Sequence, residues 1–407
     1  MRAYFAKVLY DGKGVRRNAY VLVEGEKIVK VSDSKPECEI VEGEVITPAF
    51  IDAHSHVGMD RQGEPVKEGE ANDKLSQILP EIDSINGVYF DDKAFEEAIE
   101  HGVLYSIVVP GSGNVLGGKA WLVRNFAKNR DEAGIRRIGY KMALGYNPRS
   151  TENWKGERPS TRMGVYAMLE SEFERMRRKI REFEIDLKRK ERELRKKVEN
   201  GEMSEEEAKE ELEEEREKFR LSLGLKEEHL ADILSGKALV KTHVHKEDDA
   251  LYLIHLKNRF GINCTAEHLL DVHRREIFEK LKQAKIPATY GPLDAFAYKV
   301  ELKHESYKNV KHLMASGLDF CLMSDHPATL ARDLFLQLRH FLRYGMSEAQ
   351  AIALITSKPA EIHGIEELGS VESGKLASFA GWSGDPFDLR SRITAVVAEG
   401  KYMEIEP

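Results

Sequence analysis

Length, composition and charge limit the class of protein before any motif is considered. The chain has 407 residues, 41% of them hydrophobic and 32% charged, which is typical of a folded protein with one large and one small domain. The net charge is −8, so the sequence does not indicate a strongly basic surface of the kind that attracts nucleic acid or an anionic membrane. We therefore expect no nucleic-acid or membrane partners.

The sequence also predicts a cytoplasmic location. No apolar run approaches the ~20 residues that cross a bilayer, and the first residues lack the apolar core of a signal peptide. Cys38, Cys264 and Cys321 are widely spaced and form no CxxC pair, so they are predicted to be reduced thiols.

Both ends of the chain are rich in residues that favour strands. Residues 1–48 contain strand-like runs separated by the turn pairs Asp11-Gly12 and Glu24-Gly25. Residues 367–407 repeat this pattern, as in "LASFAGWSGDPF" and "RITAVVAEGKYMEIE". The two ends are predicted to form one small composite β-sandwich.

Residues 49–366 alternate short apolar strands with helices. Examples of the strands are "VLYSIVVPG", "GYKMALG", "ALVKTHVH", "INCTAEH" and "DFCLMSDH". Strand–helix alternation over this length predicts an α/β fold with a parallel sheet, closed as a (β/α)8 TIM-like barrel.

One segment, residues 165–224, departs from the barrel pattern. Its apolar residues follow the 4-3 spacing of a heptad seam, at Phe173, Met176, Ile180, Phe183, Leu187, Leu194 and Val198. Gly201 can end this helix, and Ser204 with Glu207 forms a capping box that opens a second one. The segment is predicted to be an inserted antiparallel coiled-coil hairpin, its first arm on the order of 45 Å long. Its role is open between a lid, an insertion without a role and, as we favour, a contact between copies in a homo-oligomer.

Histidine or aspartate stands at the end of four predicted strands. His54 and His56 end the first, in "FIDAHSH", and side chains two apart on a strand point to the same side. The later strand ends carry the remaining members, His243, His245, His268, Asp325 and His326. Taken singly, each could be a hydrogen-bonded structural residue or a helix cap. Because a barrel gathers the carboxyl ends of its strands at one face, the set together predicts a metal site.

Seven other histidines fall in helices or linkers and are given no role. They are His101, His229, His255, His304, His312, His340 and His363.

Three stretches, "PAFIDAHSH", "SDHPAT" and "HGIEELGSVESGKLASFAGWSGDPFD", resemble the amidohydrolase superfamily of metal-dependent hydrolases, and within it the imidazolonepropionase-related branch. The resemblance covers nearly the whole chain except the hairpin. It implies that His54, His56, His243, His268 and Asp325 bind one or two divalent ions. Imidazole and carboxylate ligands suit Zn²⁺ best, with Fe or Mn as alternatives.

The resemblance also implies a catalytic role for Asp325. It would take a proton from metal-activated water and return it to the leaving nitrogen. Many relatives bridge two metals with a carboxylated lysine or a glutamate on the fourth strand. Lys141 is the candidate bridging ligand here, and Lys241 replaces it if the strand count is off by one. Tyr146 stands where an acidic residue is common, so a one-metal site is also compatible with the sequence.

Four further residues are predicted to contact the substrate. His245 shares the face of His243 and is its rival as the ligand, and His326 adjoins Asp325. Asn114 lies in the glycine-rich stretch "PGSGNVLGGKAWLVR", which is either a loop whose amides approach a substrate carboxylate or a turn before a β-hairpin. Arg162, at the root of the hairpin, could clamp an anionic substrate.

The function predicted from these residues is hydrolysis of a C–N bond, in a non-peptide amide such as a cyclic amide of a small molecule. A deaminase acting on a heterocycle is the alternative, with Glu247 as its acid/base, because deaminases place a glutamate shortly after the fifth-strand histidine. A non-catalytic scaffold that interacts through its hairpin is the alternative from another class.

Overall fold

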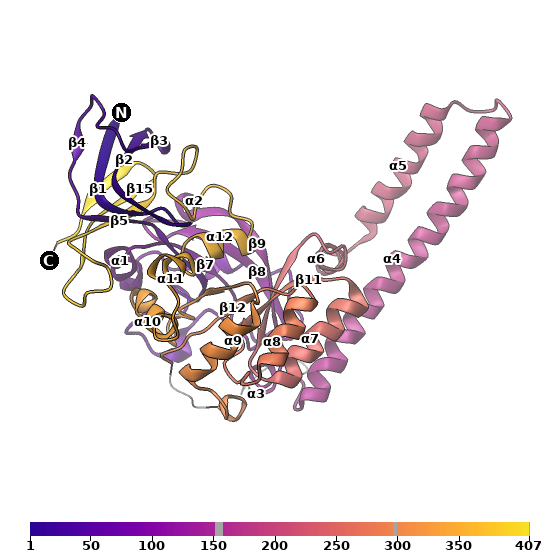
Figure 1. The fold of residues 1–407 in the computed structure, drawn as a ribbon. Coiled ribbons are helices and arrows are strands. Elements are labelled where there is room, and N and C mark those ends of the chain that lie inside the picture. Colours follow the sequence, from indigo (N-terminus) through magenta and orange to yellow (C-terminus); the bar gives the residue numbers. More distant parts are fainter. Residues whose placement is uncertain (151–157, 296–298, 407) are drawn as a thin grey trace.

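The computed structural model describes residues 1–150, 158–295 and 299–406, and contains two eight-stranded sheets (Figure 1). One sheet forms the barrel and the other gathers both ends of the chain. The helical hairpin projects from the barrel on the side away from the terminal sheet (Figure 1).

The barrel sheet follows the chain order, so that each strand pairs with the next. Its strands are β6 (Phe50–Ser55), β7 (Val103–Val108), β8 (Leu116–Arg124), β9 (Gly134–Ala143), β10 (Leu239–Val244), β11 (Asn263–His268), β12 (Ala288–Tyr290) and β13 (Phe320–Leu322). Seven of them run parallel, and β8 is antiparallel to both β7 and β9. The predicted TIM-like barrel is therefore confirmed, with one reversed strand.

The reversed strand explains the glycine-rich stretch before it. Residues 109–115 are a turn between β7 and β8, which pair as an antiparallel hairpin, so the second of the two interpretations of this stretch describes its backbone. Gly118 in β8 has to be glycine, because a Cβ atom there would lie 2.1 Å from the carbonyl oxygen of Ile82.

The two edge strands of the barrel sheet meet at their carboxyl ends. The Asp325 N–H donates to the His54 carbonyl at 3.0 Å, and the His56 N–H donates to the His326 carbonyl at 3.1 Å. Buried Asp52 joins the same ends, since it accepts from the backbone N–H of Ser324 at 2.9 Å and from its hydroxyl. These contacts bring Asp325 beside the HxH pair.

The second sheet confirms that both termini form one β-structure. Its strands are β1 (Arg2–Tyr10), β2 (Val15–Glu24), β3 (Lys27–Ser32), β4 (Ile40–Val41), β5 (Val45–Pro48), β14 (Phe379–Trp382), β15 (Ile393–Ala398) and β16 (Lys401–Glu404). The two ends join where β5 pairs with β14. The domain limits 1–48 with 367–407, 49–366 and 165–224 stay predictions.

The helices of the described ranges cover the barrel or form the hairpin. They are α1 (Lys93–Glu100), α2 (Arg130–Ala133), α3 (Asn147–Ser150), α4 (Arg162–Glu199), α5 (Glu205–Ser222), α6 (Leu225–Leu234), α7 (Glu247–Phe260), α8 (Arg275–Gln283), α9 (Val310–Ser316), α10 (Leu338–Leu342), α11 (Glu348–Ala353) and α12 (Ser357–Ile362). No helix in these ranges combines the length and apolarity needed to cross a bilayer.

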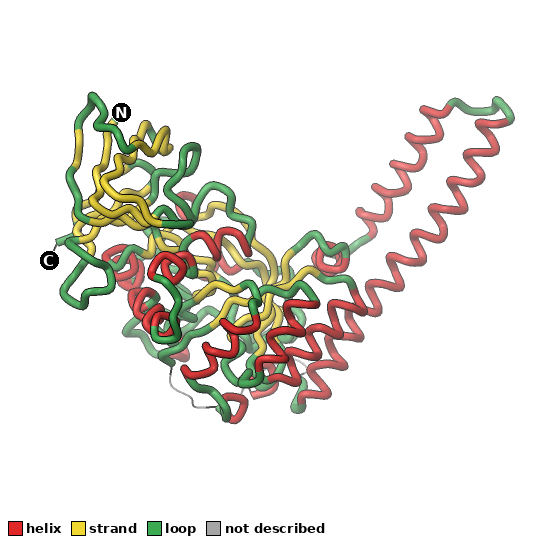
Figure 2. Tube along the Cα trace, in the orientation of Figure 1, coloured by secondary structure: helices red, strands yellow, loops and turns green. Residues whose placement is uncertain are grey.

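The hairpin consists of α4 and α5, antiparallel and extended away from the barrel (Figure 2). The 38 residues of α4 span about 57 Å, longer than the predicted arm, because its first part packs on the barrel. Phe173 and Met176, expected in the seam between the arms, belong instead to the barrel core, and the Phe173 ring meets that of Phe260 of α7. Between the free arms, Phe183 stacks on Phe219 at 4.1 Å.

Candidate metal centre

The predicted ligands form two groups at the carboxyl ends of the barrel strands. The first triad is His54, His56 and Asp325, from β6 and the end of β13. One Asp325 oxygen, Oδ1, lies 3.5 Å from His54 Nε2 and 3.3 Å from His56 Nε2. Two imidazole nitrogens therefore face one carboxylate oxygen, which is the arrangement a shared cation would occupy.

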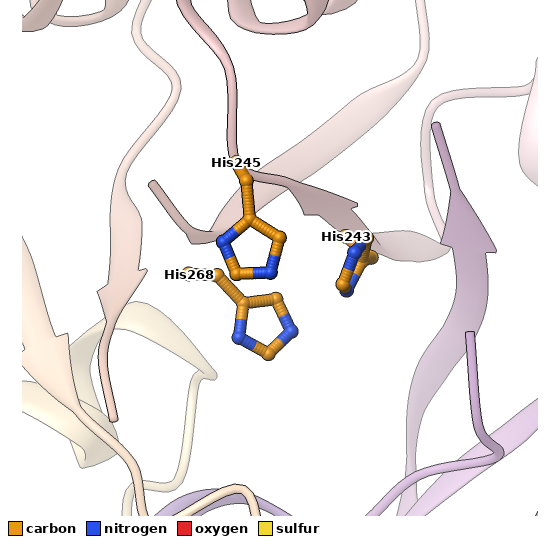
Figure 3. Close-up of side chains that lie close together, drawn as sticks. All are labelled: His243, His245 and His268. Atoms are coloured by element: carbon orange, nitrogen blue, oxygen red, sulfur yellow. The ribbon is translucent and has the colours of Figure 1, made fainter. Parts of the chain in front are cut away.

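The second triad is His243, His245 and His268, from β10 and β11 (Figure 3). The ring centroids lie 4.4 Å apart for His243 and His268, 4.7 Å for His243 and His245, and 4.8 Å for His245 and His268. All three side chains are buried. Both members of the HxH pair on β10 thus reach the centre.

The two triads are adjacent. His268 Nδ1 is 4.0 Å from Asp325 Oδ2, and the His54 and His268 rings are 5.0 Å apart. Asp325 therefore stands between the triads and could contribute to either one shared ion or two neighbouring ions.

Hydrogen bonds fix which nitrogen of three histidines can bind a metal. Nδ1 of His54 lies 2.8 Å from the Glu267 carboxylate, Nδ1 of His56 lies 2.7 Å from the Val109 carbonyl, and Nδ1 of His268 lies 3.0 Å from the Gly291 carbonyl. Because those oxygens only accept, each Nδ1 carries a proton, and the neutral rings of His54 and His268 keep the lone pair on Nε2. His56 differs, because burial lowers its pKa but the hydrogen bond to Asp325 outweighs burial and raises it. Metal-ligating histidines are commonly oriented in this way.

The protonation states also fit cation binding. Burial lowers the pKa of His54, His243, His245 and His268 well below its usual value, so these imidazoles are neutral. Burial raises the pKa of Asp325, but its hydrogen bond to His56 and the charge of Lys141 outweigh this and lower it. Neutral imidazoles and an ionised carboxylate are the forms that coordinate metals.

Two histidines of the second triad hold nitrogens without a hydrogen-bonding partner among the described residues. Within residues 1–150, 158–295 and 299–406, neither ring nitrogen of His243 nor Nδ1 of His245 has a hydrogen-bonding partner, although both side chains are buried. An unsatisfied buried polar atom is costly, and a bound metal would satisfy it. The residues present therefore fit a divalent ion.

The backbone turns sharply where two candidate ligands are presented. His268 and Asp325 have φ values of 76° and 52°, in the left-handed region that residues other than glycine rarely adopt. Such strained positions cluster at functional sites, where the surrounding structure enforces them.

The two candidate bridging lysines, Lys141 and Lys241, make different contacts. Lys141 of β9 is fully buried, and its Nζ donates to His54 Nε2 at 2.9 Å. Burial lowers the pKa of Lys141 to about 8. Nζ of Lys241 instead lies 3.0 Å from Glu267 and 2.7 Å from His363 Nε2. Lys141 is therefore the lysine that reaches the ligand atoms.

Two other predicted substrate contacts, His326 and Asn114, have different hydrogen-bonding surroundings. Buried His326 accepts from the Ala331 N–H at Nδ1, and its Nε2 has no hydrogen-bonding partner in the described part of the chain. Asn114 holds the preceding segment, since its amide donates to the carbonyls of Asp73 and Ser76. Their substrate contacts stay predictions.

Arg162 lies at the root of the hairpin, as expected. Its guanidinium is half-buried and lies 3.5 Å from Asp248 and 3.7 Å from Asp249, both in the first turn of α7. It is thus engaged with acidic partners, and its proposed contact with an anionic substrate stays a prediction.

Sequence reasoning missed two buried carboxylates that support the site. Glu267 holds His54, and Asp52 joins β6 to the segment carrying Asp325. Both precede a named histidine by one or two residues in the strands "FIDAHS" and "NCTAEH". An acidic residue in an otherwise apolar buried strand was the available signal, because it requires a partner.

The comparisons with known proteins agree with this geometry. Residues 45–406 match the Amidohydrolase family. The chain belongs to this family. An amidohydrolase of known structure from Thermotoga maritima MSB8 is 28% identical, with a TM-score of 0.81 and 99% of each chain covered. A Xaa-Pro dipeptidase solved with bound methionine shares the fold, with a TM-score of 0.57 and 13% identity over 99% of each chain.

A curated relative is also similar over most of the chain. Amidohydrolase tasK from Hapsidospora irregularis is 26% identical over 405 residues, 93% of this chain. The chain spans only 39% of the length of that relative. Membership of the amidohydrolase family supports a hydrolase that acts on C–N bonds, and the family typically binds a divalent metal. The imidazolonepropionase-related branch stays a prediction.

Proposed function

We propose that this protein is a metal-dependent amidohydrolase that hydrolyses a C–N bond of a small molecule, with a non-peptide amide such as a cyclic amide as substrate. The observation that carries the proposal is the convergence of two triads whose available nitrogens face one aspartate. His54, His56, His243, His268 and Asp325 are the proposed ligands, and Zn²⁺ is the proposed metal because imidazole and carboxylate suit it best.

The division of labour follows from the side chains. A divalent ion held by these ligands would lower the pKa of bound water to about 7 and polarise the scissile carbonyl. Asp325, ionised and beside both triads, takes the proton of the attacking water and returns it to the leaving nitrogen. His245 and His326 are buried at the same face and are proposed to hydrogen-bond the substrate.

Lys141 is the proposed bridging ligand of a two-metal site. With a pKa of about 8, a sizeable fraction of its amine is neutral near that pH. Carbon dioxide adds to neutral Nζ with loss of one proton, and the resulting carbamate offers two oxygens where the amine offered one nitrogen. The contact of Nζ with His54 Nε2 supports this placement. Without the carbamate, Lys141 occupies the position as an ammonium and one ion is expected.

The deaminase alternative is weakened by the contacts of Glu247. Its carboxylate accepts from the backbone N–H groups of His273 and Arg274 and from the Arg274 guanidinium. Burial raises the pKa of Glu247, but the hydrogen bonds from Arg274 and His273 outweigh it and lower the pKa. A carboxylate held and ionised in this way is poorly suited to deliver a proton to a heterocycle.

The scaffold alternative is disfavoured by the buried triads. Placing five buried histidines and an aspartate together, with ring nitrogens that lack hydrogen-bonding partners within the described residues, costs stability that a scaffold has no reason to lose.

We also propose that the hairpin joins copies of the chain in a homo-oligomer, and that the protein is cytoplasmic. No side chain of α5 is buried within the described single chain. Ile185 and Leu221, 42% and 77% exposed, stand two residues after Phe183 and Phe219, the rings that stack between the arms. Sedimentation of wild type against an Ile185→Asp/Leu221→Asp variant tests this: the variant should be monomeric. A wild-type monomer, or a variant with unchanged mass, would contradict it.

Metal content per chain is the first test of the main proposal. Wild type and a His54→Ala/His56→Ala variant are purified and analysed by elemental analysis, then assayed on cyclic amides, linear amides, dipeptides and amino-heterocycles. We expect one or two transition-metal ions in wild type, loss of at least one in the variant, and turnover of an amide. A metal-free wild type after reconstitution with Zn²⁺, Mn²⁺ or Fe²⁺ would overturn the proposal, and turnover of amino-heterocycles alone would favour the deaminase.

A further inference from the structure

A chain of buried polar side chains leads away from the candidate metal centre through the barrel interior. It begins at His54 and continues through Glu267 and Lys241 to His363, which directly follows α12. Glu267 and Lys241 are fully buried, from neighbouring strands β11 and β10. Barrel interiors are usually filled by branched apolar side chains, so this pair is an exception.

The contacts of Glu267 leave its carboxylate a single orientation. Oε2 accepts from His54 Nδ1 at 2.8 Å and from Lys241 Nζ at 3.0 Å, and Oε1 accepts from the hydroxyl of Thr265. Oε2 therefore cannot turn away from His54 without breaking an ion pair inside the barrel.

Lys241 is in turn held by His363. Its Nζ donates to His363 Nε2 at 2.7 Å, and His363 Nδ1 lies 2.9 Å from the Pro359 carbonyl, which fixes the ring as an acceptor at Nε2. Burial and the charge of Lys241 lower the pKa of His363 to about 3, so the ring is neutral. Lys241 therefore forms its ion pair with Glu267, and His363 supports it as a neutral acceptor.

His54 differs from His56 and His268 in the kind of group that orients its ring. His56 and His268 are each oriented by a backbone carbonyl, of Val109 and Gly291, whereas His54 is oriented by a side chain. A buried ion pair is weak evidence for a gain in stability, because desolvation offsets the attraction. Its presence behind a candidate ligand points to positioning.

We propose that Glu267 is a positioning residue for His54, holding its Nε2 toward the metal, and that Lys241, anchored by His363, holds Glu267 in place. The inference rests on the proposed metal site. Partners of this kind behind ligating histidines change metal affinity by about 10–100-fold when removed.

The test uses a variant that removes both charges together. In Glu267→Leu/Lys241→Met no unpaired charge remains, so the barrel can fold while His54 loses its acceptor. Zn²⁺ is titrated into wild type and variant in competition with a chromophoric chelator, and the melting temperature is recorded. We expect a folded variant whose tightest Zn²⁺ site is weakened about 10–100-fold.

A matched control separates positioning from general weakening. Glu399 pairs with Arg124 at 2.7 Å, remote from the triads in the turn between β15 and β16, and Glu399→Gln removes that pair. It should leave Zn²⁺ affinity at the wild-type value. Should the double variant fail to fold, Glu267→Met, which offers His54 no oxygen acceptor, carries the same expectation of weakened binding.

The outcomes distinguish the inference from the function beneath it. A wild type that binds no metal overturns the proposed function. A wild type that binds Zn²⁺, with a folded Glu267 variant that binds it equally well, overturns only the positioning role. An equal loss of affinity in Glu399→Gln also overturns it, because the effect would not be specific to the chain behind His54.

Discussion

The barrel interior and the hairpin contain the same kind of ion pair in opposite environments. Lys241 and Glu267 lie 3.0 Å apart with neither side chain exposed, whereas Lys190 and Glu211 join α4 to α5 at the same distance with about a third of each side chain exposed. Removing one partner of a buried pair costs about 3–5 kcal/mol, while an exposed pair contributes about 0–1 kcal/mol. Two ion pairs of equal length therefore contribute very differently to the stability of the protein.

The largest effect is expected inside the barrel, at Asp325. Asp325→Asn removes the proposed proton acceptor while keeping the size of the side chain, so kcat should fall by about 10²–10⁴-fold. The measurement is steady-state turnover of the amide identified by the substrate panel, with metal content recorded on the same sample. A variant with wild-type kcat would remove Asp325 from the proposed chemistry.

Lys141 tests whether a buried lysine serves as a ligand. If its carbamate bridges two ions, Lys141→Met should bind one ion fewer per chain, and added bicarbonate should raise the activity of wild type but not of the variant. Elemental analysis and activity with and without bicarbonate check this. Lys190→Met in the hairpin is the matched control, since it removes an exposed lysine. An unchanged metal content in Lys141→Met would leave a site without a bridging lysine.

The second triad separates a ligand from a substrate contact. We expect His243→Ala to lower the number or affinity of bound ions, and His245→Ala to keep the ions while raising KM or lowering kcat about tenfold. Chelator competition combined with steady-state kinetics gives both readouts. The reverse pattern would exchange the two roles, which is possible geometrically because both rings lie within 5 Å of His268.

Acid should destabilise the metal-free protein through the barrel. His363 has a pKa of about 3 in the folded chain against about 6.5 when unfolded, because it is buried beside Lys241. The unfolded chain thus binds the extra proton, so this contribution to stability is complete above about pH 6.5 and is lost as the pH falls toward about 3. Each such histidine contributes about 1.4 kcal/mol per pH unit to the slope of the unfolding free energy.

Urea unfolding at a series of pH values measures that slope. His363→Gln should lower the slope of the unfolding free energy against pH by the contribution of one histidine. Glutamine can still accept from Lys241, but it does not titrate. Residues 165–224 contain no histidine, so shortening the hairpin should leave the slope between about pH 6 and pH 5 unchanged. If shortening the hairpin changed the slope and His363→Gln did not, this assignment would be contradicted.

The same comparison explains what the sequence could predict. The hairpin arises from local signals, the heptad spacing and the Ser204–Glu207 capping box, and a helical hairpin was predicted correctly, although its first arm is longer than expected. The HxH pair and Asp325 could be placed together because a barrel gathers its strand ends. The partners of Glu267 and Lys241 could not be predicted, because His54 and His363 lie more than a hundred residues away and no local pattern records the contacts.

The boundary between hairpin and barrel shows a further limit. Phe173 and Met176 continue the heptad spacing without a break, yet they pack on the barrel rather than on α5. An apolar stripe on a helix specifies that one face is buried, and tertiary structure decides against which surface. The reversed direction of β8 was left open for a similar reason, since the residues of an apolar strand do not indicate its direction.

The smallest effect is expected for the exposed pair of the hairpin. Lys190→Met should change the free energy of unfolding by less than about 1 kcal/mol, and the change should shrink further at high salt, because screening weakens exposed charges. Lys241→Met, made in parallel, leaves Glu267 buried without its cation and should cost about 3–5 kcal/mol with little dependence on salt. Urea unfolding of both variants at low and high ionic strength checks this. If Lys190→Met proved as costly as Lys241→Met, the hairpin would have to be enclosed in solution, as contact with a second copy of the chain would make it.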